Sequence, residues 1–439
     1  MTQTKLALCL LAPCLLALAP LAAVAQTPSA TGNWLVSANY FGTPMYVRLN
    51  LQQTGDKLTG TYRGFKLEGT IHDAAFHLSA TDEQGNTDEL TGTIANGTLQ
   101  ATDTETDADN KANPVTLKIT ATLAPALAHP TPRRHEFTPT VFYRQFSALN
   151  KPVLTINPGD TIHTTTVDAG GNDLNGVKRS LGGNPQTGPF FVTGAMPGDV
   201  LIVHINKLTL NRDWAGSDDG LDERAMNSDL AVKMKDVGKG IRWNLDRTAG
   251  TATPDKPAEH LKHYTIPLKP MLGCISAAPG IAQAAPGTGD SGGYGGNMDF
   301  NEVTEGATVY LRVSNPGALL YFGDGHAAQG DGELNGNALE TSMDVDLTVD
   351  IIPNKRINGP RIENATDIIA MGLAGSLDDA FKAATSDMAT WLGEDYKLTP
   401  SEIAQVLGTA AEYHVSEVAD RNAGIILKIN KARLGTLTK

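Results

Sequence analysis

Apolar and polar residues alternate with a period of two from Gly32 to about Leu123, and turn signals interrupt the alternation roughly every ten residues. The segment 45–51 shows the pattern clearly, because Val47, Leu49 and Leu51 alternate with more polar side chains. Successive side chains of a strand point to opposite faces, so this alternation predicts strands with one buried face. Short strands at this spacing predict a small antiparallel β-barrel or sandwich over residues 26–124.

A proline-rich stretch ends this first pattern. Four prolines lie between Pro125 and Pro139, which predicts a linker over residues 125–139. Beyond it, apolar segments such as 200–205, 319–322 and 345–349 alternate with loops rich in Gly, Pro and Asp. These segments predict a second domain over residues 140–439 with a buried β core. Residues 210–257 show little periodicity and predict a long excursion on the surface or over the site.

The spacing of apolar residues becomes helical near the C-terminus. From Asp367 onward they recur at three and four residues, which predicts helices. Ser376 is expected to begin a helix that reaches Leu392, and Thr399 with Glu402 fits the capping box of another. The predicted fold class is mainly β with α cover (α+β), in which a barrel or sandwich module precedes a sandwich-type core with C-terminal helices.

The first 25 residues have the pattern of a secretory signal. Lys5 precedes an apolar run that ends in Ala23-Val24-Ala25, as in signals that are cleaved after a small-x-small site. A retained membrane anchor is the alternative, and two prolines within the run make it the poorer interpretation. The prediction is a periplasmic or secreted protein with no membrane anchor in its mature form. Cys9 and Cys14 leave with the signal, so the mature chain holds only Cys274 and forms no internal disulfide.

The charge of the chain argues against one class of partner. Its formal net charge is −13, and loss of Lys5 with the signal makes it −14. Nucleic-acid binding needs clustered Lys and Arg, whereas Arg133-Arg134 is the only adjacent arginine pair. We therefore expect no nucleic-acid partner.

The stretch 292–350 combines glycines, carboxylates and a histidine more densely than any other. Its centre is Gly323 to Glu333, with the sequence GDGHAAQGDGE, and Glu340 follows seven residues later. Asp324 and His326, with Glu333 and Glu340 near in sequence, are ligand types of divalent metals. The glycines permit close backbone approach, and Glu340 is a candidate general base for water. The alternative is that Asp and Gly merely build tight turns and that His326 is an ordinary hydrogen-bonded residue.

Other candidates are weaker on their own. Asp168 closes a predicted strand, where an Asp is usually a cap or turn former. Asn297 and Asp299 follow a glycine-rich run and have the same ambiguity. Cys274 could be a thiol nucleophile, but its apolar neighbours favour a buried core residue.

Six sequence blocks occur in the order seen in the acetamidase/formamidase family. They are PQTGP at 185–189, GAMPGD at 194–199, PMLG at 270–273, GGNMD at 295–299, PGAL at 316–319 and GDGHAAQGDGE at 323–333. The chain resembles this family over residues 128–434. The resemblance implies a β core with α cover, hydrolysis of short aliphatic amides, a divalent metal, and a dimer or larger homo-oligomer. The N-terminal β module departs from the family pattern and resembles small lipocalin-type modules.

The leading hypothesis is a metal-dependent amidase that converts a small linear amide into a carboxylate and ammonia. Expected roles are metal binding for Asp168, Asp324 and His326, catalysis for Glu340, Glu333 and Asn297, and backbone stabilisation of the oxyanion at Gly296 and Gly325. Zinc or calcium is the expected metal. The alternative hypothesis is a non-catalytic envelope protein that binds a ligand or partner through its N-terminal β module.

Overall fold

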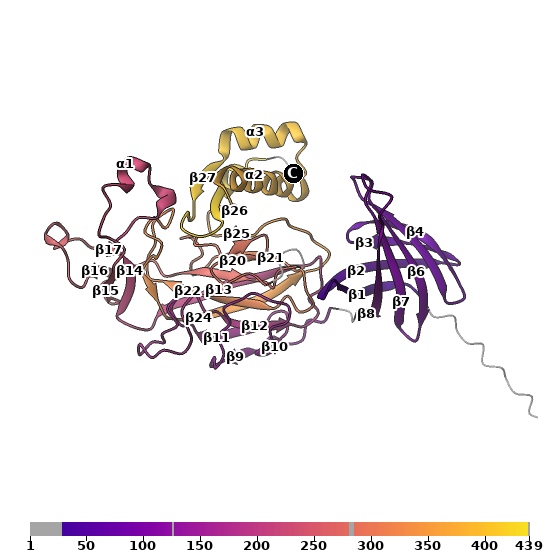
Figure 1. The fold of residues 1–439 in the computed structure, drawn as a ribbon, viewed down its shortest axis with the longest axis horizontal. Helices are drawn as coiled ribbons and strands as arrows, with labels where there is room; N and C mark the ends of the chain where they lie inside the picture. Colours follow the sequence, from indigo (N-terminus) through magenta and orange to yellow (C-terminus); the bar gives the residue numbers. More distant parts are fainter. Residues whose placement is uncertain (1–28, 125–126, 281–284, 438–439) are drawn as a thin grey trace, which may run out of the picture.

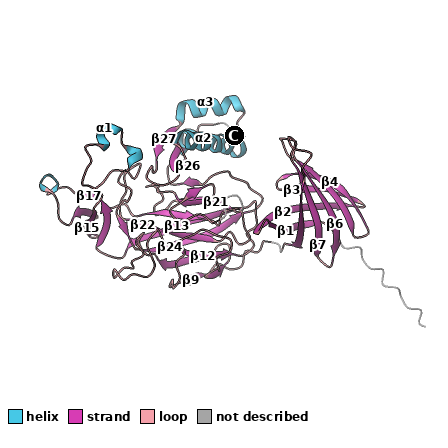
Figure 2. Ribbon diagram, viewed as in Figure 1, coloured by secondary structure: helices cyan, strands magenta, loops and turns pink. Residues whose placement is uncertain are grey.

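The protein consists of a β-barrel beside a larger two-sheet body that carries helices on one side (Figure 1). The computed structural model describes residues 29–124, 127–280 and 285–437. Strands make up most of the regular structure, and the two long helices lie together over one face of the body (Figure 2). The predicted signal (residues 1–25) lies outside the described residues. Within the described ranges, no helix is both long enough and apolar enough to span a lipid bilayer.

The N-terminal module is a closed antiparallel barrel, which confirms the barrel form of the prediction. Each strand pairs with the next, and the last pairs with the first. Its eight strands are β1 (Gly32–Tyr40), β2 (Thr43–Thr54), β3 (Lys57–Tyr62), β4 (Phe65–His72), β5 (Ala75–Thr81), β6 (Thr87–Ala95), β7 (Thr98–Thr106) and β8 (Val115–Leu123). Alternate residues such as Trp34, Leu49 and Leu78 point inward and form a continuous apolar core. The barrel interior is thus filled by side chains, as in small barrels generally.

The body contains two large sheets whose strands differ in length. The first has the order β17-β16-β15-β14-β23-β22-β18-β20-β19, with β12 paired to β22 and β10 paired to β12. Its strands are β10 (Leu154–Ile156), β12 (Thr187–Val192), β14 (Trp214–Asp218), β15 (Gly240–Asp246), β16 (Thr251–Pro254), β17 (Ile266–Pro267), β18 (Met271–Ser276), β19 (Ser291–Gly292), β20 (Gly295–Asn297), β22 (Leu320–His326) and β23 (Glu340–Thr341).

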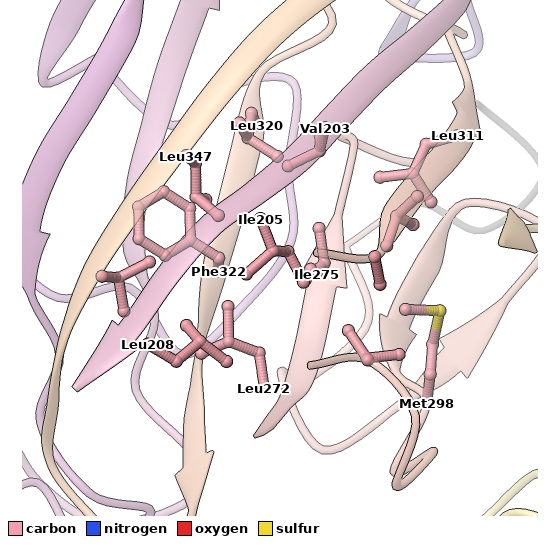
Figure 3. Packing of buried hydrophobic residues seen from close by; sticks show 14 of the residues in the cluster. Val203, Ile205, Leu208, Leu272, Ile275, Met298, Leu311, Leu320, Phe322 and Leu347 are labelled. Atoms are coloured by element: carbon pink, nitrogen blue, oxygen red, sulfur yellow. The ribbon is translucent and has the colours of Figure 1, made fainter. Parts of the chain in front are cut away.

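The second sheet has the order β27-β28-β26-β25-β21-β13-β24-β11-β9. Its strands are β9 (Arg134–Glu136), β11 (Thr161–Thr165), β13 (Val200–Leu210), β21 (Thr308–Arg312), β24 (Met343–Ile352), β25 (Arg361–Glu363), β26 (Asp367–Ala374), β27 (Glu412–Val415) and β28 (Ala423–Asn430). Apolar residues of the two sheets, among them Ile205, Leu347 and Phe322, meet in one large core (Figure 3). The predicted sandwich-type core is therefore confirmed.

Helix α2 covers one face of the second sheet. The structure contains α1 (Ser228–Ala231), α2 (Leu377–Asp395), α3 (Pro400–Ala410) and α4 (Lys431–Leu434), with short 3-10 turns at Glu223–Ala225 and Glu259–Leu261. Ser376 caps α2 through a bond from the Asp379 N–H, and Thr399 with Glu402 forms the predicted capping box of α3. Ala384, Met388 and Leu392 of α2 pack against β26 and β28.

Two predictions of local structure are wrong. Residues 367–374 form strand β26 and not a helix; Ile368 and Ala370 face the helices while Ile369 and Met371 face the core between the sheets. A strand buried on both faces is apolar at nearly every position, so its sequence imitates helical spacing. The supposed excursion at 210–257 contains β14, β15 and β16, which extend the first sheet.

The barrel contacts the body through two arginines. Arg48 of β2 binds Asp199 at 2.6 Å and donates from Nε to the Pro197 carbonyl at 3.1 Å. Arg356 of the body donates to the Arg63 carbonyl at the turn after β3. Asp199 is almost fully buried, so this ion pair is a specific contact between the two parts.

We expect Arg361→Met to destabilise the body strongly. Arg361 of β25 binds Asp387 of α2 through Nε–Oδ2 (2.6 Å) and Nη2–Oδ1 (3.1 Å), and both side chains are only 2% exposed. Removing one partner of a buried ion pair leaves a buried charge, at a cost of about 3–5 kcal/mol. Urea unfolding should show this loss, and Arg134→Met at an exposed ion pair should change the free energy by less than about 1 kcal/mol. A loss below about 1 kcal/mol for Arg361→Met would contradict the assignment.

Candidate active site

The alternation of side-chain direction is interrupted within strand β22, and this interruption positions the site. Phe322 points into the core between the sheets, and Gly325 faces that core again, because a Cβ added there would meet Met343. Strict alternation would not place residues three apart on one face. The break is at Asp324, whose backbone is left-handed with φ of 58°. Asp324 and His326 thereby share the opposite face.

His326 is fully buried and held in one orientation by Gln329. Its Nδ1 lies 2.9 Å from Oε1 of Gln329. The Gln329 amide nitrogen donates to the carbonyls of Asp299 (2.5 Å) and Ser416 (3.3 Å), so the amide oxygen must face the imidazole. Nδ1 therefore carries a proton and donates to Gln329. Nε2 is left to face the acids, the arrangement typical of a metal-binding histidine.

Four carboxylates converge on His326 in two overlapping groups. Asp324, His326 and Glu340 form one group, and Asp299, His326 and Glu333 form the other, with candidate ligand atoms within 4.8 Å of one another in each. Nε2 lies 3.2 Å from Oε1 of Glu340 and 3.4 Å from Oδ1 of Asp324. Strand pairing explains the first contact, because His326 lies opposite Glu340 of β23.

A bare glycine leaves the space between two of these acids. A Cβ on Gly273 of β18 would lie 2.4 Å from both Oδ1 of Asp299 and Oδ2 of Asp324. Among the described residues, Oδ1 of Asp299 and Oε2 of Glu340 are buried without a hydrogen-bond partner. Buried polar atoms are normally satisfied, so atoms of this kind that converge indicate a ligand. One imidazole with Asp and Glu oxygens fits a divalent cation such as zinc.

The pKa values reflect the excess of buried negative charge. Burial raises the pKa of Asp299 well above its ordinary value, and Glu333 and Asp324 add to the effect. Burial likewise raises the pKa of Glu333 to about 8 and that of Glu340 above its ordinary value. For His326, burial lowers the pKa, but the carboxylates of Glu340 and Asp324 outweigh it, so the pKa lies well above its ordinary value. The cluster thus holds protons or cations at neutral pH.

The predicted metal ligand Asp168 lies outside both groups. Its Oδ2 binds Nη2 of Arg212 at 2.9 Å, and its Oδ1 accepts from Asn172. Arg212 also donates to Thr341 Oγ1 at 2.9 Å and to the Glu340 carbonyl at 3.2 Å. Asp168 therefore has a cation partner already, and it supports the strand that presents Glu340. Its role as a metal ligand stays a prediction, and the contacts that the structure shows are those of a supporting residue.

The other predicted residues have mixed outcomes. Asn297 is buried at the site, but its amide nitrogen donates to Asp299 and Asp420 and its oxygen accepts from Asn184, so both ends of the amide are engaged. Gly325 lies in a strand paired on both sides, with Leu272 and with Thr341. Gly296 lies between Ile275 and Ser291 in the same sheet. Backbone groups inside a sheet point to neighbouring strands, so both glycines face paired strands, and their oxyanion role stays a prediction.

Sequence reasoning left several site residues unassigned. Asp299 was noticed but not assigned, although it belongs to one of the two ligand groups. Glu417 and Asp420, whose pKa values burial raises to about 8 and about 6, enter from the loop before β28. Gln186 was part of a recognised sequence block but carried no role. Cys274 is fully buried, and burial raises its pKa, which supports its interpretation as a core residue.

We expect Gly273→Ala to remove cation binding while leaving the fold intact. The added methyl group would occupy the space between Asp299 and Asp324. The control is Gly216→Ala in β14, beside Glu340, where no heavy atom of the described chain lies within 4 Å of the added carbon. Elemental analysis after zinc loading should show at least a tenfold loss for Gly273→Ala alone. Equal zinc content in both variants would count against this site.

Comparisons with known proteins agree with this architecture. A model of the acetamidase/formamidase family matches residues 276–369. A putative formamidase of Schizosaccharomyces pombe is 28% identical over 220 residues, which cover 38% of this chain and 52% of that protein. An acetamidase of Mycolicibacterium smegmatis is 42% identical over 59 residues, or 13% of this chain and 14% of that protein. The chain thus matches about half the length of the first relative and much less of the second.

Two crystal structures resemble most of the chain. A predicted acetamidase/formamidase from Thermoanaerobacter tengcongensis superposes with a TM-score of 0.61 and 28% identity, covering 70% of this chain and 98% of that one. An acetamidase from Yersinia enterocolitica gives a TM-score of 0.61 and 29% identity, with coverage of 70% and 95%. The resemblance inferred from the sequence blocks is confirmed: an additional β-barrel precedes a domain that is similar to acetamidases and formamidases.

Proposed function

We propose that the protein is a metal-dependent amidase that hydrolyses a small linear amide to a carboxylate and ammonia. The observation that carries the proposal is Nε2 of His326, which lies 3.4 Å from the Asp324 carboxylate and 3.2 Å from that of Glu340 while Gln329 holds Nδ1. The similarity to proteins named formamidase and acetamidase supports the class of substrate.

The cation would be held by His326 with Asp324 and Glu340, or with Asp299 and Glu333. When bound, a divalent cation would polarise the amide carbonyl and acidify the attacking water. The fixed Nδ1–H of His326 keeps its ring from rotating and keeps Nε2 directed at this position. Because the two ligand groups share His326, the cluster has more carboxylates than one ion requires, which leaves carboxylates for proton transfer.

Glu340 and Glu333 are the proposed proton carriers. Burial raises the pKa of Glu340, which brings a carboxylate closer to the basicity that a general base needs near neutral pH. Its Oε2 has no hydrogen-bond partner within the described chain, so it is open to a water or substrate proton. Glu333, with its pKa raised to about 8, is mainly protonated at neutral pH and can supply a proton to the departing nitrogen. Its Oε1 is fixed by the N–H of Ala338 at 3.0 Å.

The enclosure of the site supports a small substrate. His326, Asp324 and Asp299 are each 3% exposed or less. A surface pocket of about 480 Å³ is lined by Gly183 and Thr288, which adjoin the buried Asn184. We propose this pocket as the approach to the site. A short aliphatic amide fits such a route better than a peptide.

Export and self-association complete the proposal. The signal pattern supports a periplasmic or secreted enzyme, and the family resemblance supports a homo-oligomer. The alternative of a barrel that binds a ligand in its interior gains no support, because apolar side chains fill that interior, whereas binding of a partner by the barrel surface stays a prediction.

We expect His326→Ala to abolish amide hydrolysis. Loss of the imidazole removes the residue common to both ligand groups, and loss of a principal catalytic group typically lowers kcat by at least about 1,000-fold. Ammonia release from formamide and acetamide measures this, with and without a chelator. The matched control is His414→Ala, which removes a half-exposed imidazole bound to Asp331. Failure of the metal-loaded wild type to release ammonia from any small amide would refute the function.

We expect the metal-free protein to become less stable as the pH rises. The pKa of Glu333 is raised from 4.5 to about 8, so the folded state binds protons that the unfolded chain has lost. A raised pKa stabilises the folded state fully when the pH is below the pKa of the unfolded chain. This stabilisation is lost as the pH rises from the unfolded pKa to the folded pKa, here from 4.5 to about 8. Glu417 acts over the same window. The raised pKa of His326 has the same sign, since protonated His326 stabilises the folded state until the pH passes its folded pKa.

The free energy of unfolding should fall by up to about 1.4 kcal/mol per pH unit for each proton that the folded state retains. Urea unfolding in chelator at about pH 5.5 and pH 8 measures it, and added zinc should restore stability most at the higher pH, where fewer protons compete. A stability that rises between these two pH values would contradict the burial of these acids.

A further inference from the structure

We propose that Gln186 recognises the NH2 group of a primary amide, and that a chain of three buried carboxamides fixes its orientation for this task. The inference rests on the proposed amidase function and adds a residue that determines which acyl compounds are accepted. Gln186 precedes β12 and is completely buried. Its own backbone is fixed by two bonds with Tyr143, from Gln186 N to Tyr143 O (2.8 Å) and from Tyr143 N to Gln186 O (3.2 Å).

The orientation of the chain is set at its acidic end. The nitrogen of Asn297 lies 2.6 Å from Oδ2 of Asp299 and 2.6 Å from Oδ2 of Asp420. With the cation bound, these carboxylates are ionised and only accept hydrogen bonds, so the NH2 of Asn297 must face these two oxygens. The oxygen of Asn297 then faces Asn184, which donates to it.

The same logic carries through the next two amides. The nitrogen of Asn184 also donates to the Thr288 carbonyl at 3.3 Å, which confirms its orientation independently. The Asn184 oxygen therefore faces Gln186 and accepts from its nitrogen at 2.8 Å. That nitrogen also donates to the Asn184 carbonyl at 3.0 Å, so both N–H bonds of Gln186 are used.

The consequence is an acceptor with a defined direction. Oε1 of Gln186 is buried and lacks a hydrogen-bond partner within the described residues. It lies 2.9 Å from the position that a Cβ on Gly323 would take, immediately before Asp324. Leaving a buried acceptor unsatisfied is costly, so this oxygen indicates that a donor binds here.

The position of this oxygen relates it to the cation site. Gly323 and Asn297 both lie opposite Cys274, on either side of β18. The adjacent residue of β18 is Gly273, over which Asp299 and Asp324 converge. Gln186 therefore lies at the edge of the sheet surface around Gly273, beside the carboxylates of Asp299 and Asp324.

Primary amides present the donor that this acceptor requires. With the carbonyl directed at the cation, the NH2 group of a planar amide can donate to Oε1 of Gln186 while its nitrogen becomes the leaving group. An ester of the same acyl group has no N–H and leaves the acceptor unsatisfied. Sites that bind a substrate N–H or O–H discriminate strongly against analogues without it. Asn184 and Asn297 act as positioning residues, since they hold Gln186 and do not contact the substrate.

The test compares acetamide with methyl acetate in wild type and in Gln186→Met, both zinc-loaded. Methionine keeps the volume and removes the acceptor. We expect kcat/KM for acetamide to fall by about 10- to 100-fold, while kcat/KM for methyl acetate changes less than about threefold. If methyl acetate is not turned over, its inhibition constant replaces its rate. The ratio of kcat/KM for acetamide to kcat/KM for methyl acetate, measured in one variant, does not depend on the fraction of protein that is folded.

Two further variants separate recognition from general damage. Asn184→Leu removes the residue that orients Gln186 and should lower the amide-to-ester ratio in the same direction. Asn315→Leu removes another buried amide, bonded to the carbonyls of Ala278 and Pro279, and should leave the ratio unchanged. An equal loss for both substrates in Gln186→Met, or no loss for acetamide, would overturn the assignment and leave the amidase function standing. A wild type inactive on every primary amide would instead refute the function itself.

Discussion

The structure depends on how a buried cluster of carboxylates is neutralised. Asp299, Asp324, Glu333 and Glu340 surround one imidazole in a region with little access to water. Burying a charge is costly unless it is paired, so this group requires either protons or a cation. Within the described part of the chain, no arginine forms an ion pair with these four carboxylates; Arg212, close by, is bound to Asp168. Gln329 binds Nδ1 of His326 and so directs Nε2 at the acids. The site therefore requires a positive charge and has space for a cation.

The sequence contained the centre of this site but not its surroundings. Asp324, His326 and Glu340 could be identified because ligand types and glycines lie close together in the chain. Asp299 and Asp420 come from distant segments and reach the site only through the register of β18 with β20 and the loop before β28. Asp168 shows how a partner distant in sequence changes the interpretation of a residue, because Arg212 lies in the bend between β13 and β14.

The fold was predictable to a similar degree. The barrel has one buried face on every strand, so alternation was a reliable guide to it. Strand β26 is buried between the core and α2, and its apolar residues on both faces removed the alternation that identifies a strand. The left-handed backbone of Asp324 was likewise invisible in the sequence, although glycines on both sides of it indicated an unusual backbone. That single residue explains how a strand can present Asp324 and His326 on the face opposite Phe322.

The central claim is that a cation completes the cluster around His326, and anomalous X-ray scattering tests it most directly. Crystals of the zinc-loaded protein would be measured above and below the zinc absorption edge. The account predicts an anomalous peak bonded to Nε2 of His326 and to oxygens of Asp324 and Glu340, or of Asp299 and Glu333. An ordered site with no anomalous peak and with Nε2 of His326 hydrogen-bonded directly to a carboxylate would contradict it.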